Sequence, residues 1–296
     1  MDFPRVSPHF LACRRAVRPH RGPTAVTVGL SGGPDSLALL AAAVVEGVDA
    51  RAVIVDHQLQ EGSAEVAHRA AEQARALGAR AEIRTVDVAP GNLEAQARQA
   101  RYAALLADGR DVWVGHTRDD QAETLLLGAL RGNPAGMSPR AGRIVRPFLG
   151  IRRADTVGAC AELGLEPWRD PFNEDTDFRR VALRRFLDGQ LHGDATDPLA
   201  QTADRIAADN ALLEELAGPP TDDCAELAAQ PGPLRRRRIA AWVRERGGKV
   251  TGASISAIEA LCVDWHGQGG VAVGGDAGGR LEVTRSGGRL AVTLKA

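Results

Sequence analysis

Apolar residues between Thr24 and Val114 follow two alternating patterns. Short runs rich in Val and Ile, typical of buried strands, alternate with longer segments in which Leu and Ala recur every three or four residues, typical of helices. The expected strands are 25–30, 51–56, 81–88 and 111–116, and the expected helices are 36–46, 64–77, 93–107 and 119–130. This alternation predicts an α/β fold with a parallel, doubly wound sheet.

The pattern changes in the last third of the chain. A further strand at 143–149 and a helix at 152–163 extend the first domain, and a polar, proline-containing loop then leads into a basic helix that ends near 187. Helices are expected near 199–216, 234–248 and 255–263, followed by two or three short strands with glycine turns. We therefore expect a catalytic domain at 1–194 and a smaller, mainly helical domain at 195–296 that ends in short strands.

Length and composition fit two domains, since the chain has 296 residues and 44% of them are hydrophobic. The sequence has neither an apolar stretch long enough for a membrane span nor a secretory signal, which predicts a cytoplasmic protein that does not bind a membrane. Its four cysteines are scattered without a C-x-x-C pair, which argues against a zinc ribbon or a disulfide framework. The cysteines are Cys13, Cys160, Cys224 and Cys262.

The formal net charge is −1, so composition alone does not indicate a nucleic-acid-binding protein. Nearly all positive charge is arginine, because Lys249 and Lys295 are the only lysines and both lie near the C-terminus. The first half of the chain therefore lacks the lysine of a Walker A phosphate loop.

The stretch "SGGPDS" (31–36) lies between the first expected strand and the first expected helix. Backbone amides in a glycine turn and a helix N-terminus suit a phosphate group, although a tight turn without a ligand is the alternative. The G-x-G-x-x-G pattern of dinucleotide-binding folds is absent. The stretch resembles the pyrophosphate loop of the N-type ATP pyrophosphatases. Its ATP-binding residues would be Ser31, Gly32, Gly33, Pro34, Asp35 and Ser36.

Polar residues also follow two other expected strands. Asp56 and His57 end the second strand, where ligands of parallel sheets bind and where the adenosine of an ATP above the 31–36 turn would be within reach. The alternative is a solvated strand end. His116 ends the fourth strand, and three acids follow in the first turns of the next helix: Asp119, Asp120 and Glu123. Carboxylates on one helix face suit Mg²⁺ or a general base, whereas acids favoured by the helix dipole are the alternative.

The order of several motifs resembles the tRNA(Ile)-lysidine synthetase family. The matching stretches are "SGGPDS", "VDHQL", "NLEAQARQARYAAL", "GHTRDDQAETLLLGALRG", "VRPFLGIRR" and "WRDPFNEDTDFRRVALRRFL". Two positions depart from the family pattern, because Val181 stands where asparagine is usual and Gln60 where arginine is common. The C-terminal part resembles the family's smaller helical domain more weakly, and the additional C-terminal domain of longer members is not expected.

The resemblance implies an enzyme that uses ATP and Mg²⁺ to join L-lysine to C2 of the wobble cytidine in a tRNA(Ile) with a CAU anticodon. The cytosine oxygen would be adenylated first, and the lysine amine would then displace AMP. Asp35 and Asp120 are the expected metal ligands, and Asp35, His116, Asp119, Asp120 and Glu123 are the catalytic candidates. The sequence does not distinguish His116, Asp119 and Glu123 as the base, nor a monomer from a homodimer.

Arginines provide the expected contacts with tRNA, since guanidinium groups suit phosphates and exposed bases. For the run 235–238, a solvated helix face is the alternative. Two rival functions are a tRNA thiolation enzyme with the same loop, which would be expected to depend on paired cysteines, and a non-catalytic ATP-binding module. The tRNA-binding candidates are Arg98, Arg101, Arg131, Arg180, Arg184, Arg235, Arg236, Arg237 and Arg238.

Overall fold

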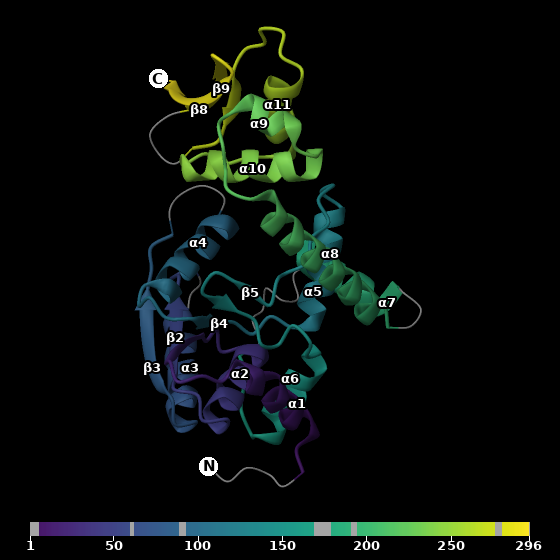
Figure 1. Cartoon of the computed structure of the whole chain (residues 1–296). Coiled ribbons are helices and arrows are strands. Elements are labelled where there is room, and N and C mark those ends of the chain that lie inside the picture. The colour runs from purple at the N-terminus through teal and green to yellow at the C-terminus, as the bar shows by residue number, and fades with distance from the viewer. Residues whose placement is uncertain are drawn as a thin grey trace. The chain divides into compact units, whose positions relative to one another are not determined.

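The computed structural model describes residues 6–59, 62–88, 93–168, 179–190, 194–275 and 280–295 (Figure 1). The chain divides into two compact units, Met1–Ala207 and Ala208–Ala296. This division lies inside helix α8 (Thr196–Ala217), whereas the boundary expected from the sequence, at 194/195, lies just before the helix begins.

A six-stranded sheet forms the centre of the first unit, with the strand order β3-β2-β1-β4-β6-β5. Neighbouring strands from β3 to β6 pair in parallel, and only the edge strand β5 is antiparallel. The predicted parallel α/β sheet is thus confirmed. The strands are β1 (Val26–Gly29), β2 (Ala50–Asp56), β3 (Arg80–Thr85), β4 (Val112–Trp113), β5 (Arg140–Ala141) and β6 (Ile144–Val145).

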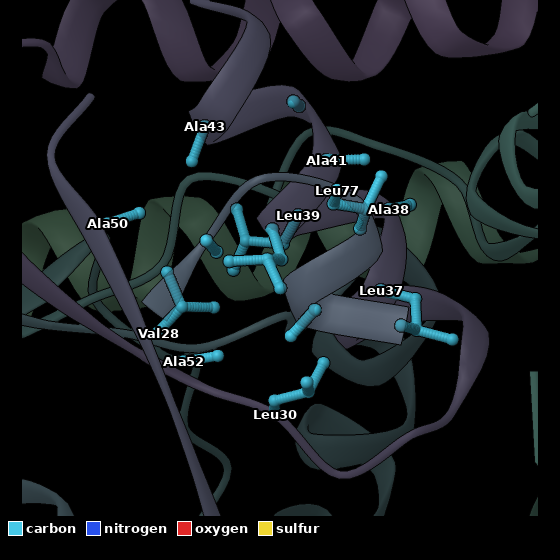
Figure 2. Close-up of a cluster of buried hydrophobic side chains, with 14 of the residues drawn as sticks. Val28, Leu30, Leu37, Ala38, Leu39, Ala41, Ala43, Ala50, Ala52 and Leu77 are labelled. Atoms are coloured by element: carbon cyan, nitrogen blue, oxygen red, sulfur yellow. The ribbon is translucent and has the colours of Figure 1, made fainter. Parts of the chain in front are cut away.

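Both faces of the sheet are covered, as strand β2 illustrates. Ala50, Ala52 and Ile54 belong to a large core that includes α2 and α3, while the alternate residue Val53 belongs to a second cluster with Leu105 of α4. Figure 2 shows leucine and alanine side chains of α2 gathered with side chains of β1 and β2. Because successive strand residues point to opposite faces, an apolar run such as β2 identifies a strand buried on both sides.

The helices of the first unit follow the predicted order, with an α-helix and a short 3₁₀ helix added at the N-terminus. They are α1 (Pro8–Val17), the short 3₁₀ helix Arg18–His20, α2 (Pro34–Val45), α3 (Ser63–Ala76), α4 (Leu93–Leu106), α5 (Arg118–Ala129), α6 (Arg153–Glu162) and α7 (Arg179–Gln190), followed by α8. Among the described residues, no helix is long and apolar enough to cross a membrane.

Helix α1 was not predicted from the sequence. Its apolar stripe is only three residues long, at Phe10, Cys13 and Val17, and all three are buried. The carboxylate of Glu162 at the end of α6 accepts hydrogen bonds from two first-turn amides of α1, those of His9 and Phe10. A partner about 150 residues away along the chain therefore stabilises a helix start that local sequence barely indicates.

Two expected strands are reduced to two residues each in the structure. The strand expected at 111–116 is only Val112–Trp113, and the one expected at 143–149 is Ile144–Val145, which forms a hairpin with β5. The residues after Trp113 leave the strand and lead into α5. This early end of β4 places Gly115 and His116 beside a cavity at the edge of the sheet.

The second unit contains helices packed with a three-stranded antiparallel sheet of order β7-β8-β9. The expected helices followed by short strands are confirmed. The buried centre includes Leu227, Ile239, Trp242, Ile258 and Val283. The elements are α9 (Cys224–Ala229), α10 (Gly232–Glu245), α11 (Gly252–Val263), β7 (Val271–Val273), β8 (Arg280–Ser286) and β9 (Arg289–Lys295).

Candidate active site

The stretch 31–36 forms a compact turn between β1 and α2. Gly32 has a φ of +83°, a backbone conformation that favours glycine. The hydroxyl of Ser36 donates to the carbonyl of Gly33 at 3.0 Å and accepts from the amide of Ser31 at 3.1 Å. Pro34 is the first residue of α2, and no side chain among the described residues caps this helix. Its first-turn amides therefore remain for a ligand such as a phosphate.

A cavity of about 500 Å³ lies where β1, β2 and β4 end. It is large enough for a nucleotide-sized ligand. A second cavity of about 290 Å³ shares Ser31, Asp35, Asp120 and Trp168 with the first. The predicted residues that line the larger cavity are Ser31, Asp35, Ser36, Asp56, His57, Arg98, Arg101, His116 and Asp120, and Gly33, Pro34 and Arg184 line the smaller one.

Asp56 and His57 occupy the end of β2 with different roles. The buried Asp56 carboxylate accepts a hydrogen bond from the amide of Gln58 at 2.9 Å and so supports a residue with φ of +54°. Burial and the nearby Arg101 lower the pKa of His57. Among the described residues, the buried Nδ1 atom of His57 has no hydrogen-bond partner. Asp56 thus shapes the turn, and a neutral His57 can meet a ligand in the cavity.

Asp35 is held from two sides at the start of α2. The Thr156 hydroxyl donates to its Oδ1 atom, and the guanidinium of Arg153 lies 4.0 Å from Oδ2. Burial raises the pKa of this carboxyl to about 6, although the Thr156 hydrogen bond and Arg153 oppose the rise. Asp35 therefore carries its charge at neutral pH at a cost to stability.

We expect Asp35→Asn to stabilise the ligand-free protein more at pH 7.5 than at pH 5. The folded-state pKa of about 6 lies above the ordinary value of 3.8, so the Asp35 carboxyl binds its proton more tightly in the folded state than in the unfolded state. Wild-type stability therefore falls as pH rises through this window, and the variant escapes that loss. The gain in unfolding free energy should grow by about 1.5 kcal/mol between the two pH values. Urea unfolding of both proteins measures it, and a gain that shrinks with pH would contradict the expectation.

The three acids of α5 face different partners. Asp119 Oδ2 accepts a hydrogen bond of 2.7 Å from the backbone amide of Arg153 and thereby caps helix α6. Asp120 pairs with Thr117 in a capping box, with its Oδ2 atom accepting from the Thr117 amide at 2.8 Å. Glu123 is buried, with 1% of its side chain exposed. Of the three, Asp120 is the one that lines both cavities.

Arg153 lies at the centre of the site, and its position was not predicted from the sequence. Its guanidinium donates to Asp120 Oδ1 at 2.8 Å and to Glu123 Oε1 at 3.0 Å, in addition to its contact with Asp35. Arg184 donates to the same Glu123 oxygen at 2.9 Å. The signal in the sequence was a basic residue at the start of the helix expected at 152–163, within the quoted stretch "VRPFLGIRR".

Gly115 and Trp168 are two further residues that the sequence did not single out. A Cβ atom on Gly115 would lie 2.9 Å from the backbone C and O atoms of Asp35, so only glycine lets the end of β4 approach the start of α2 this closely. The amide of Trp168 donates to the carbonyl of Gly32 at 2.9 Å, and the residue lines both cavities. Both residues thus fix the 31–36 turn from outside it.

The predicted tRNA-contacting arginines of the first unit lie in different places. Arg98 and Arg101 of α4 line the larger cavity, and their guanidinium groups lie 5.0 and 5.6 Å from the ring centre of Tyr102. Arg131 is exposed just after α5. Arg180 belongs to the first turn of α7, but its side chain lies outside the part that the structure describes.

The run Arg235–Arg238 is largely engaged within the second unit. Arg235 and Arg236 both bind Glu259, while Arg237 donates to Asn210 at 2.5 Å and Arg238 to Glu226 at 2.5 Å. Only 6% of the Arg238 side chain is exposed, against 56% for Arg236. These contacts favour a structural role for three of the four arginines and leave Arg236 most accessible to a partner.

A magnesium ion fits the carboxylates of the site on chemical grounds. No group of three or more potential protein ligands occurs among the described residues. Mg²⁺ commonly uses one or two carboxylates together with phosphate oxygens and water, and the Asp35 and Asp120 oxygens converge on a common cation, the guanidinium of Arg153. The pair can therefore serve as the protein's share of a metal site that ATP completes.

The four cysteines are buried and lack the setting of reactive thiols. Burial raises the pKa of Cys13, Cys160 and Cys262 to about 12. A thiol with such a pKa is protonated at neutral pH and is a poor nucleophile and metal ligand.

Comparison with known proteins identifies relatives over nearly the whole chain. A model of the PP-loop domain matches residues 10–191. The tRNA(Ile)-lysidine synthase of Corynebacterium glutamicum is 50% identical, covering 99% of this chain and 98% of that protein, and the one of Corynebacterium diphtheriae is 52% identical, covering 98% and 99%. A U34-tRNA thiolase from Methanococcus maripaludis shares the fold, with a TM-score of 0.54 at 17% identity over 67% of this chain and 79% of that one.

The PP-loop model covers more than half of the chain, and the curated relatives are similar along both units. The chain belongs to the tRNA(Ile)-lysidine synthase family and carries a PP-loop domain.

Proposed function

We propose that the protein forms lysidine, using ATP to join L-lysine to C2 of the wobble cytidine in a tRNA(Ile) with a CAU anticodon. The similarity to lysidine synthases over 99% of the chain carries this conclusion. The PP-loop beside a nucleotide-sized cavity supports it independently, because it provides the ATP site that such a ligation requires. We also propose that the reaction takes place in the cytoplasm, where these substrates meet.

ATP is proposed to lie with its pyrophosphate at residues 31–36 and its adenosine toward the end of β2. The first-turn amides of α2 and the Ser31 and Ser36 hydroxyls would hold the pyrophosphate. His57 would meet the adenosine through its Nδ1 atom. These groups become more important as the reaction proceeds, since negative charge on the leaving pyrophosphate grows in the transition state.

In the first step, the cytosine 2-oxygen attacks the α-phosphorus of ATP and pyrophosphate leaves. Asp35 and Asp120 would hold Mg²⁺, which neutralises charge on the phosphates. The carboxylates are already oriented for this task, because Thr156 and Thr117 each fix one of their oxygens. Adenylation turns the cytosine oxygen into part of a good leaving group.

In the second step, the lysine ε-amine attacks C2 and AMP leaves with the former cytosine oxygen. The ammonium must first lose a proton, and His116 is the candidate that lines the larger cavity. The other two candidates line neither cavity, since Asp119 caps α6 and Glu123 is held by two arginines. We therefore propose His116 as the base.

The tRNA is proposed to contact both units. Arg98 and Arg101 reach the larger cavity and can stabilise the phosphate or base of the reacting nucleotide, while Arg131 and Arg236 are exposed. Arg180 and Arg184 of α7 remain candidates on the first unit. Residues 1–194 would form the catalytic domain and 195–296 the tRNA-binding domain.

No observation favours either rival function. The thiolase named above is similar in fold alone, and none of the four buried cysteines lines either cavity. The sulfur atoms of Cys224 and Cys262 lie 3.6 Å apart, but both belong to the buried centre of the second unit, where sulfur transfer to a substrate is not possible. A passive nucleotide-binding module would not need a cluster of three carboxylates and two arginines beside its phosphate loop.

The direct test combines purified protein, ATP, Mg²⁺, radiolabelled lysine and unmodified tRNA(Ile) with a CAU anticodon. We expect acid-stable label on this tRNA, with AMP and pyrophosphate released in equal amounts. A tRNA(Met) with the same anticodon is the control and should remain unlabelled. Release of AMP without lysine on the tRNA would keep the adenylating site and overturn the proposed substrate.

A further inference from the structure

Arg153 is surrounded by the carboxylates that the proposed reaction uses. Its Nη2 atom donates to Asp120 Oδ1 at 2.8 Å, its Nη1 atom donates to Glu123 Oε1 at 3.0 Å, and its Nε atom lies 4.0 Å from Asp35 Oδ2. The side chain is 22% exposed. Because a guanidinium keeps its proton in proteins, Arg153 is a permanent cation inside the site.

The two aspartates are each held on the side away from Arg153. Asp35 Oδ1 accepts from the Thr156 hydroxyl, and Asp120 Oδ2 accepts from the Thr117 amide and, at 3.0 Å, from its hydroxyl. Their remaining oxygens pair with the same guanidinium. These two oxygens therefore face one cation from two sides, and a Mg²⁺ ion bound by both aspartates would compete with Arg153 for that position.

The Arg153 guanidinium and a Mg²⁺ ion cannot both bind the two aspartates at the same time. A divalent ion between Asp35 and Asp120 would lie next to the guanidinium, and like charges at such short distances in a partly buried site repel strongly. The structure also offers the displaced guanidinium a new partner, because Arg153 lines the 290 Å³ cavity together with Ser31 and Gly33, where phosphate oxygens are expected.

We propose that Arg153 is a positioning residue that occupies the metal position between Asp35 and Asp120 in the nucleotide-free protein and yields it when Mg²⁺ arrives with ATP. This role rests on the function proposed above. It makes metal binding depend on the nucleotide, because the phosphates both complete the metal site and receive the guanidinium. Without ATP, the protein binds the metal weakly while its carboxylates stay aligned.

The test measures Mn²⁺ binding to the nucleotide-free protein from the electron paramagnetic resonance signal of the free ion. Arg153→Gln should bind Mn²⁺ at least about tenfold more tightly than wild type, because it removes the competing cation. Arg184→Gln is the matched control: it removes the same charge from beside Glu123, and the hydrogen bonds of the Arg184 guanidinium described in the structure go to Glu123 rather than to Asp35 or Asp120. We expect the control to change the Mn²⁺ affinity by less than about threefold.

A gain in affinity separates this role from a merely structural one, since a loosened site would bind the ion more weakly. Adding Asp35→Asn to Arg153→Gln should abolish the gain and so locate the ion. An affinity equal to or below that of wild type, or an equal gain in Arg184→Gln, would overturn the proposal. Should Arg153→Gln fail to fold, as melting would reveal, Arg153→Lys provides a second test with a smaller gain. The binding measurement does not use tRNA or lysine, so it can succeed even if the lysidine assay fails.

Discussion

Asp35→Asn and Asp120→Asn are each expected to lower the rate of lysine transfer to tRNA by at least about a thousandfold. Both residues line the two cavities at the PP-loop, and each would lose a negative oxygen that faces the shared cation. The loss falls on the transition state, where the charge on the leaving pyrophosphate is greatest. Initial rates of radiolabelled lysine incorporation at saturating ATP measure it.

The two variants should remain folded, because asparagine keeps an oxygen for the hydrogen bonds that orient each side chain. In Asp35→Asn the amide oxygen can still accept from Thr156, and in Asp120→Asn it can still accept from Thr117. Far-ultraviolet circular dichroism and melting temperatures verify this. A near-normal rate in either variant would contradict the assignment of that residue to the metal and phosphate site.

Asp119→Asn is the matched control, since Asp119 is adjacent in sequence and of the same type. Its carboxylate caps α6 and pairs with Arg152 instead of lining a cavity. We expect a rate loss of about tenfold or less, from a weaker start of the helix that carries Arg153. A loss as large as that of Asp120→Asn would mean that the two neighbouring acids act as a unit.

Local sequence patterns were sufficient to predict most of the fold and part of the candidate site. The strands, most helices and the 31–36 turn depend on local patterns, and the structure has them in the predicted order. The placement of His57, His116 and Asp120 at one cavity also followed from a general rule, because parallel strands bring their carboxyl ends to one edge.

The rest of the site depends on contacts between distant residues. Thr156 reaches Asp35 across 121 positions and Arg153 reaches Asp120 across 33, and no local pattern records such a pair. The contacts of the arginine run in α10 could not be predicted from local sequence either. Its composition suggested a basic surface, but Glu226 and Glu259 come from other helices and engage Arg238, Arg235 and Arg236. Local sequence indicates which charges exist, and the fold decides which of them neutralise one another.

Gly115→Ala is expected to lower the lysine-transfer rate by about a hundredfold without unfolding the protein. A Cβ atom at this position would lie 2.9 Å from both the carbonyl carbon and oxygen of Asp35 and 3.1 Å from the amide nitrogen of Ser36. These neighbours are backbone atoms, so rotation of a side chain cannot relieve the overlap. The end of β4 and the start of α2 must move apart instead, and misplacement of reacting groups by about 1 Å can cost a hundredfold in rate.

The displacement should weaken ATP binding and lower the rate together, because the first-turn amides of α2 belong to the segment that moves. We therefore expect the apparent KM for ATP to rise as the rate falls, whereas loss of a metal ligand acts chiefly on the rate. Gly22→Ala is the matched control: nothing lies within 4 Å of its Cβ position, and its φ is not in the left-handed region. It should behave as wild type. A normal rate in Gly115→Ala would show that the β4 end and the PP-loop can separate without consequence, and the close approach would then serve packing alone.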